Sequence, residues 1–229
     1  FEKDGTLDLE KVKAAIKPDN IHFPRTRLLC LENTNSGTVV PLEYLARART
    51  FTSTHKLGLH LDGARLCNAS VKLGVPIAEI TRHFDSVSLC LSKGLGAPVG
   101  SVLVGRKDFI KRALRWRKIA GGGMRQAGII AAAGIYALEN HVDRLAEDHA
   151  NMQKLIRGLS DIDEVHLEDG TGETNMVFFH TDRDEELKAH MKERGILIGG
   201  YATIRLVTHL DVSSKDVALI VDEIKNFFS

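Results

Sequence analysis

Short apolar runs alternate with longer amphipathic stretches through the first two-thirds of the chain, and this alternation narrows the possible folds most. The runs have the length of buried strands, whereas the stretches between them place apolar residues at helical spacing. Strands that alternate with helices are typical of crossover units, which build a mostly parallel sheet. The sequence therefore predicts an α/β fold with strands at residues 27–31, 57–61, 86–91 and 101–104, and helices at residues 8–16, 42–56 and 64–73.

Long helical patterns replace this alternation after residue 106. Three helices are predicted at residues 107–118, 125–139 and 142–159. A smaller α+β pattern follows them, with strands at residues 176–180 and 204–208 and helices at residues 185–194 and 215–228. We predict a large domain over residues 1–140 and a small C-terminal domain over residues 141–229.

Charge and cysteine content exclude several classes of partner. Lys and Arg number 31 against 30 for Asp and Glu, a formal net charge of +1, whereas nucleic acids and anionic membranes attract a clear basic excess. No apolar run is long enough to span a bilayer, and the first residues lack a signal-peptide pattern. The three scattered cysteines fit reduced thiols, and no pair of histidines has metal-binding spacing. We expect a soluble cytoplasmic protein without a catalytic metal.

The segment from Leu59 to Arg65 carries the first candidate for chemistry. It delivers Asp62 at the end of an apolar strand, and Gly63 permits a tight exit. Ligands of open parallel sheets bind outside the carboxyl ends of the strands, so a functional acid is expected at this position. The alternative is that Asp62 is the N-cap of the helix that follows, which is a common use of aspartate.

Lys93 is the second candidate, because it follows the next apolar strand and precedes a glycine-rich turn. A lysine held beside apolar surface has a lowered pKa and can form a Schiff base. The alternative is a solvated lysine at the start of a loop. The glycines at positions 94, 96 and 100 do not have the spacing of a dinucleotide-binding fingerprint.

An acid at the end of one strand and a lysine at the end of the next are what pyridoxal phosphate requires, since the carboxylate keeps the pyridine nitrogen protonated and the lysine bonds to the aldehyde carbon. The segments 60–65 and 92–101, with 31–34, 121–126 and 205–211, resemble those of the low-specificity L-threonine aldolases. These are fold-type I pyridoxal-phosphate lyases, so the resemblance implies a fold-type I large domain followed by a small α+β domain.

The resemblance also implies residue roles and an activity. Lys93 corresponds to the lysine joined to the cofactor, Asp62 to the partner of the pyridine nitrogen, and Arg65 and Arg205 to anchors of the substrate carboxylate. Lys118 and Arg125 correspond to residues near the cofactor phosphate; the alternative is two ordinary basic residues at a helix corner. The implied reaction cleaves L-threonine or L-allo-threonine to glycine and acetaldehyde. A homotetramer with active sites at subunit interfaces is implied as well.

Two departures from the family pattern qualify these expectations. Asn35 stands where the family commonly has a histidine near the substrate hydroxyl, and an asparagine cannot accept a proton near neutral pH. The family's N-terminal segment, with its phosphate-binding loop and its ring-stacking histidine, has no counterpart ahead of Glu32, so the large domain is expected to be N-terminally incomplete.

Two alternative functions remain open from the sequence. One is a truncated aldolase homologue that is catalytically impaired or inactive and acts as a structural subunit. The other is a different fold-type I lyase, β-eliminating or desulfurising. The second is less favoured, because Cys67 and Cys90 lie in apolar segments and no flexible loop carries a cysteine.

Overall fold

The computed structural model describes residues 1–229, and the chain forms two units, each with its own hydrophobic core. Unit 1 comprises residues 1–35 and 39–142, and unit 2 comprises residues 36–38 and 143–229. No helix in the chain is long and apolar enough to cross a membrane.

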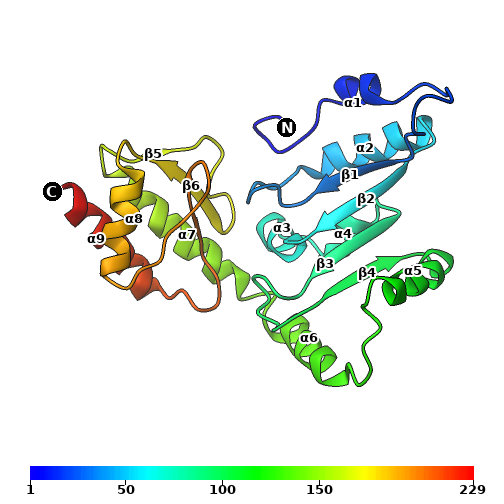
Figure 1. Ribbon diagram of the computed structural model, residues 1–229. Helices are drawn as coiled ribbons and strands as arrows, with labels where there is room; N and C mark the ends of the chain where they lie inside the picture. Colours follow the sequence, from blue (N-terminus) through cyan, green and yellow to red (C-terminus); the bar gives the residue numbers. More distant parts are fainter. The chain divides into compact units, whose positions relative to one another are not determined.

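A four-stranded sheet in the order β1-β2-β3-β4 is the centre of unit 1 (Figure 1). The first three strands run parallel, whereas β4 pairs with β3 in the antiparallel direction. Helices connect the parallel strands, because a tight turn can join only antiparallel neighbours and a parallel pair needs a longer crossover. The strands are β1 (Leu28–Glu32), β2 (Gly58–Gly63), β3 (Ser86–Cys90) and β4 (Ser101–Gly105).

One face of the three parallel strands is buried, and the other carries mostly polar residues. Leu29, Leu31, Leu59, Leu61 and Val87 alternate along the strands and join one core cluster with residues of α2 and α3. The residues between them point to the opposite face and are exposed or half-buried. The helices that precede or connect the strands are α1 (Leu9–Ala15), α2 (Leu42–Thr54), α3 (Leu66–Leu73) and α4 (Ile77–Thr81).

Two further helices, α5 (Lys107–Ile119) and α6 (Gly128–Asn140), complete unit 1 as a hairpin after β4 (Figure 1). Helix α5 contains no buried residue, although Trp116 and Ile119 are large and apolar. Helix α6 returns to the sheet, where Gly134 lies against Leu91 and the His141 ring hydrogen-bonds to the Leu95 carbonyl through Nδ1 (2.6 Å).

Unit 2 packs three helices with a three-stranded antiparallel sheet in the order β5-β6-β7. Its core contains Met152, Leu155 and Leu159 of α7, together with Val177 and Phe179 of β6. The elements are α7 (Leu145–Ser160), β5 (His166–Leu167), β6 (Met176–His180), α8 (Asp184–Glu193), β7 (Ile204–Val207) and α9 (Ser214–Phe228).

Residues 36–38 belong to unit 2 although they follow strand β1 of unit 1 in the sequence. The buried Thr174 hydroxyl donates a hydrogen bond to the Gly37 carbonyl (2.6 Å), and the Thr38 hydroxyl donates to the Gly170 carbonyl (3.1 Å). Gly37 has a φ of 92°, and a Cβ there would lie 3.0 Å from Cβ of Met176. Glycine therefore permits both the turn and the close approach.

The expected strands and long helices are confirmed within a few residues, and the ends of three helices correct the sequence interpretation. Helix α6 begins at Gly128 and not at residue 125, and α7 begins at Leu145 and not at residue 142. Helix α3 begins at Leu66 and not at residue 64. Helix α4 and strand β5 were not expected, since five and two residues are too short for a periodic signal.

Candidate functional site

Two acids end neighbouring strands of the unit 1 sheet. Glu32 is the last residue of β1 and its register partner in β2 is Asp62, whose own partner in β3 is Ser88. Because paired residues of a sheet point to the same face, the two carboxylates lie on the polar face at the carboxyl ends of the parallel strands. This is the edge of the sheet where the sequence predicts the site.

Asp62 is held by the turn that follows it. Its exposed carboxylate accepts a hydrogen bond from the Ala64 N–H (2.9 Å) through Oδ1. Helix α3 begins later, at Leu66, with Arg65 as its N-cap, so the N-cap interpretation of Asp62 is wrong. Gly63 is required because a Cβ would lie 2.7 Å from the Ser88 carbonyl oxygen. The tight exit therefore leaves the Asp62 carboxylate at the strand end.

Lys93 lies in the turn that joins β3 to β4. Backbone hydrogen bonds close this turn from Leu91 N–H to Gly100 O (3.0 Å) and from Ala97 N–H to Leu91 O (2.9 Å). The Lys93 carbonyl accepts from the Gly96 N–H (2.8 Å), and the Lys93 side chain is exposed. The lysine is thus carried by a well-bonded turn directly after the third parallel strand.

Electrostatics connects these groups. Glu32 is half-buried, and its loss of solvation, followed by the nearby charge of Asp62, raises its carboxyl pKa above the ordinary value. Arg65 and Lys93 lower the pKa of the same carboxyl, so Asp62, Arg65 and Lys93 all lie within electrostatic range of Glu32. We call Glu32, Asp62, Arg65 and Lys93 the charged cluster.

Glu32 had no role assigned from the sequence. The rule that located Asp62, an acid at the carboxyl end of a buried strand, applies to Glu32 as well and could have found it. The same charge of Asp62 also contributes, after burial, to a raised thiol pKa at Cys30, two residues earlier on β1.

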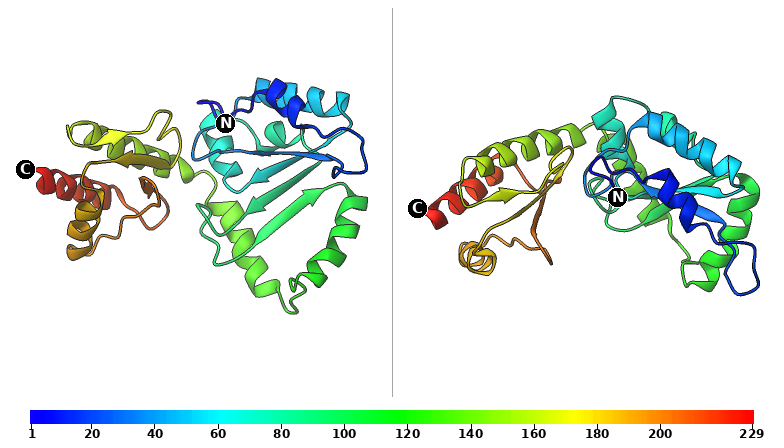
Figure 2. Two further views of the ribbon diagram at one scale, coloured as in Figure 1. Left: turned by 45° about the horizontal axis from the view of Figure 1, so that its top comes forward. Right: turned by 90° about the horizontal axis from the view of Figure 1, so that it is seen from above.

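Lys118 and Arg125 are not brought to the charged cluster by this chain. Lys118 is in the last turn of α5, and Arg125 precedes α6 by three residues, in the turn that Figure 2 shows directed away from the sheet. No hydrogen bond or ion pair joins either residue to Asp62 or Lys93. The Lys118 stem instead lies over Gly123, where a Cβ would be 2.6 Å from Lys118 Cδ.

Arg205 lies in unit 2, exposed in the middle of β7, with Phe178 of β6 as its register partner. The strand is anchored just beyond it. Thr208 donates its hydroxyl proton to the Asp148 carbonyl (2.7 Å) and accepts at its own carbonyl from Asn175 Nδ2 (3.2 Å). Beneath this, Arg144 holds the fully buried Asp148 carboxylate by two hydrogen bonds (2.6 and 3.2 Å).

The segment after β1 contains polar atoms without partners. The Asn33 side chain accepts a hydrogen bond from the Val40 N–H through Oδ1 (3.2 Å) and donates one to the Val40 carbonyl through Nδ2 (3.4 Å). By contrast, Thr34 Oγ1 and Asn35 Nδ2 in the next two residues are buried and make no hydrogen bond within the chain. Polar groups of this kind are costly to bury, so they mark a place that can bind a polar ligand group.

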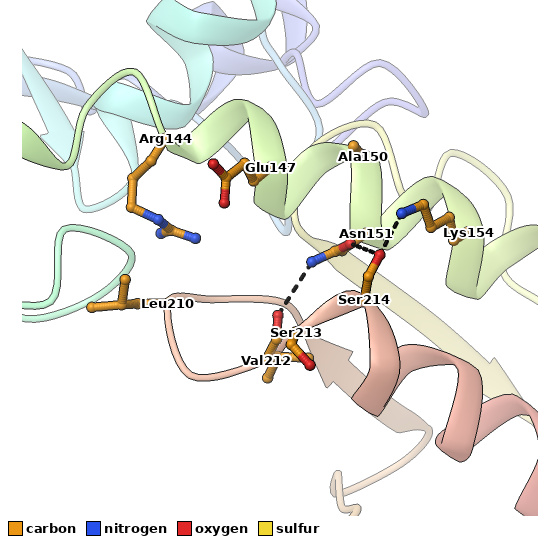
Figure 3. A pocket seen from close by; sticks show the side chains of 9 residues that line it. All are labelled: Arg144, Glu147, Ala150, Asn151, Lys154, Leu210, Val212, Ser213 and Ser214. Atoms are coloured by element: carbon orange, nitrogen blue, oxygen red, sulfur yellow. Dashed lines mark hydrogen bonds between the residues drawn. The ribbon is translucent and has the colours of Figure 1, made fainter.

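A separate hollow of about 370 Å³ lies in unit 2 between α7 and the loop before α9 (Figure 3). Its polar lining is bonded to itself: Asn151 donates to the Val212 carbonyl (3.2 Å) and accepts from the Ser214 hydroxyl (3.0 Å), and Lys154 also bonds Ser214. It contains none of the predicted site residues, so the sheet edge of unit 1 remains the candidate site.

Comparisons with solved structures define the class of fold. The chain superimposes with a TM-score of 0.83 on the structure of the Leishmania major threonine aldolase, covering 99% of this chain and 69% of that one at 21% identity. It gives a TM-score of 0.77 with a putative L-allo-threonine aldolase from Listeria monocytogenes, at 97% and 66% coverage and 22% identity. The protein has the fold-type I architecture of pyridoxal-phosphate enzymes.

Sequence comparisons narrow the class to a family. Residues 1–182 match the family model described as Beta-eliminating lyase. The chain is 52% identical to the low specificity L-threonine aldolase of Escherichia coli K12 over 99% of its own length and 68% of that protein. It is 42% identical to low-specificity L-threonine aldolase 1 of Arabidopsis thaliana, over 94% and 64%. The chain belongs to the beta-eliminating lyase family, among the homologues of the low-specificity L-threonine aldolases.

Proposed function

We propose that the protein cleaves L-threonine and L-allo-threonine to glycine and acetaldehyde with pyridoxal phosphate as its cofactor. The observation that carries this proposal is the 52% identity to the Escherichia coli threonine aldolase over 99% of the chain. The proposal extends to threonine breakdown and glycine formation. It also places the protein in the cytoplasm, and the three free cysteines support that location alone.

The charged cluster has the donor set that this cofactor needs. When bound, pyridoxal phosphate withdraws electrons from the bond that breaks at the substrate Cα. Asp62 is the residue proposed to bind the pyridine nitrogen, since its exposed carboxylate is fixed at the strand end. Lys93 is proposed to bind the aldehyde carbon, and its place in the turn that follows the next strand supports that role.

Arg65 and Arg205 are proposed to hold the substrate carboxylate. A guanidinium pairs with a carboxylate through two parallel hydrogen bonds, which fixes the orientation of the amino acid and hence the bond that is broken. Asn35 offers an unpaired amide donor to the substrate hydroxyl, but it cannot remove the hydroxyl proton near neutral pH. That proton must pass to another group.

Lys118 and Arg125 are proposed to bind the cofactor phosphate of a second copy of the chain. Within one chain the α5–α6 turn is directed away from the sheet that carries Asp62 and Lys93, which supports a role for Lys118 and Arg125 in the site of another copy. In a homotetramer with shared sites, Asp62 and Lys93 of one chain and Lys118 and Arg125 of another chain would bind the same cofactor.

The test is acetaldehyde release from L-threonine and L-allo-threonine by the protein supplemented with pyridoxal phosphate. We expect activity in the wild type and in Lys192→Ala, which removes an exposed lysine of unit 2, and none in Lys93→Ala. Borohydride reduction of the loaded protein should label the peptide that contains Lys93. A label on Lys118, or full activity of Lys93→Ala, would contradict the role assigned to Lys93. No acetaldehyde release by the wild type would contradict the function.

A further inference from the structure

Two histidines face each other across the edge of the unit 2 sheet. His166 of β5 and His180 of β6 are direct register partners in an antiparallel pair, so both side chains leave the sheet on the same face. Both are exposed, and their ring centroids are 5.2 Å apart with the ring planes inclined at 49°.

This separation matches the spacing of two imidazoles on one metal ion. A ring nitrogen lies about 1.2 Å from its ring centroid and about 2.0–2.1 Å from a bound Zn²⁺. Two rings on one ion therefore have centroids roughly 4.5 Å apart at a right angle and roughly 5.2 Å apart at the tetrahedral angle. Rotation about side-chain torsions alone can direct one nitrogen of each ring to a common point.

Nothing within the chain competes for these nitrogens. Neither imidazole takes part in a hydrogen bond or ion pair, and their contact with each other is a tilted ring pair. The opposite face of the same strands is packed, since Phe179 is fully buried and Leu167 lies against the unit 2 core. The backbone positions of the two histidines are thereby fixed while their rings are open to solvent.

The surrounding charge favours a cation. Residues 161–173, which contain His166, carry six carboxylates and no Lys or Arg, although the whole chain has a net charge of only +1. A field of this sign attracts cations to the strand edge.

We propose that His166 and His180 together chelate one divalent transition-metal ion, with water completing its coordination. Imidazole pairs suit Cu²⁺, Ni²⁺ and Zn²⁺, and Cu²⁺ is bound most strongly of the three. No group of three or more His, Cys, Asp or Glu side chains in the chain is arranged to hold a metal, so this is an exchangeable two-ligand site. The ion also stabilises the β5–β6 pairing, because it binds only when both strands are in register.

The site is tested by calorimetric titration of the untagged protein with NiCl₂. We expect one ion per chain in the tight phase, and affinity at least about tenfold weaker in His166→Ala and in His180→Ala. His22→Ala, which removes an exposed histidine of unit 1, should bind as the wild type does. Unchanged affinity in both β-strand variants would overturn the proposal.

A second measurement covers the case in which an alanine variant does not fold. Electron paramagnetic resonance of the wild type with one equivalent of Cu²⁺ should show hyperfine coupling to two imidazole nitrogens. Coupling to a single nitrogen would overturn the proposal without the use of any variant. Neither experiment depends on the lyase activity.

Discussion

Glu32 and Asp62 place two like charges side by side at the carboxyl ends of β1 and β2. A sheet that served only to pack its core would gain nothing from this pairing, because like charges directly opposite each other destabilise a sheet. Arg65 and Lys93 offset part of the repulsion, yet loss of solvation on burial, followed by the charge of Asp62, still raises the pKa of Glu32. The charged cluster therefore makes the fold less stable than it would be without these paired like charges.

We predict that Glu32→Gln abolishes the loss of folding stability that ionisation of Glu32 causes as pH rises. The folded-state pKa of Glu32 lies above its ordinary value of 4.5, so its contribution to stability is fully present below that pH and is lost as pH rises through the folded-state pKa. Urea unfolding at pH 4 and pH 7 should show the variant gaining on the wild type at the higher pH.

The control for this prediction is Glu193→Gln, which changes an exposed carboxylate at the end of α8. It should keep the pH dependence of the wild type. If Glu32→Gln also keeps it, the carboxyl of Glu32 does not experience the burial and the Asp62 charge described above.

Single residues were predictable from the sequence where a local rule applied. The end-of-strand rule located Asp62 and Lys93 without any knowledge of the third dimension. It did not decide between a ligand and an N-cap for Asp62, because that depends on whether the helix begins at Ala64 or at Leu66. The surroundings of Lys118 and Arg125 could not be predicted, since α5 has no buried residue and no local rule gives the direction of the α5–α6 turn.

At the scale of elements, periodicity identified every strand and helix that is long enough to repeat its pattern. The boundaries that moved have local causes. Gln126 has a positive φ of 50°, which is not helical, so α6 cannot begin at Arg125. Gly74 ends α3 with a φ of 65°, as its position after Leu73 predicts.

Helices α7 and α9 of unit 2 pack tightly at Gly158, where a Cβ would be 2.5 Å from Val221. We predict that Gly158→Ala destabilises unit 2 by about 1–3 kcal/mol, because the added methyl group overfills a packed interface. Thermal or urea unfolding measures the change, and Val221→Ala in the same chain should restore much of the loss.

Gly128→Ala is the matched control, since Gly128 begins α6 and a Cβ there meets nothing within 4 Å. It should be neutral or stabilise the protein by up to about 1 kcal/mol through helix propensity. A loss in Gly128→Ala as large as that in Gly158→Ala would mean that the effect comes from the backbone and not from the α7–α9 contact.

At the scale of the whole molecule, a net charge of +1 conceals strongly charged segments. Residues 106–125 carry eight basic side chains and one acidic side chain. The same stretch exposes Trp116 and Ile119 at 70% each, and Met124 at 58%. Exposed apolar side chains in a strongly charged frame are typical of an interaction surface, which agrees with the proposal that this stretch meets a second copy of the chain.

We predict that two inactive variants restore activity when mixed. Lys93→Ala lacks the cofactor lysine, and Arg125→Ala lacks the proposed phosphate ligand. If the two residues of one site come from different chains, random mixed oligomers should contain about a quarter of intact sites. Acetaldehyde release should therefore appear after the variants are mixed, unfolded together and refolded.

Native mass spectrometry identifies mixed oligomers in that experiment. Their formation without any recovery of activity would place Lys93 and Arg125 of the same chain in one site. Activity of Arg125→Ala by itself would remove this residue from the cofactor site altogether.

The short passage of residues 36–38 through unit 2 has a consequence for how the protein is made. A ribosome releases Gly37 more than a hundred residues before Thr174, whose hydroxyl is the partner of the Gly37 carbonyl. Unit 2 therefore cannot be completed from residues 143–229 alone. Until Thr174 has been synthesised, residues 36–38 of the nascent chain lack this hydrogen-bond partner. A gene fragment that starts at residue 143 would leave the buried Thr174 hydroxyl without its acceptor, so the two units are unsuited to being inherited or shuffled as independent modules.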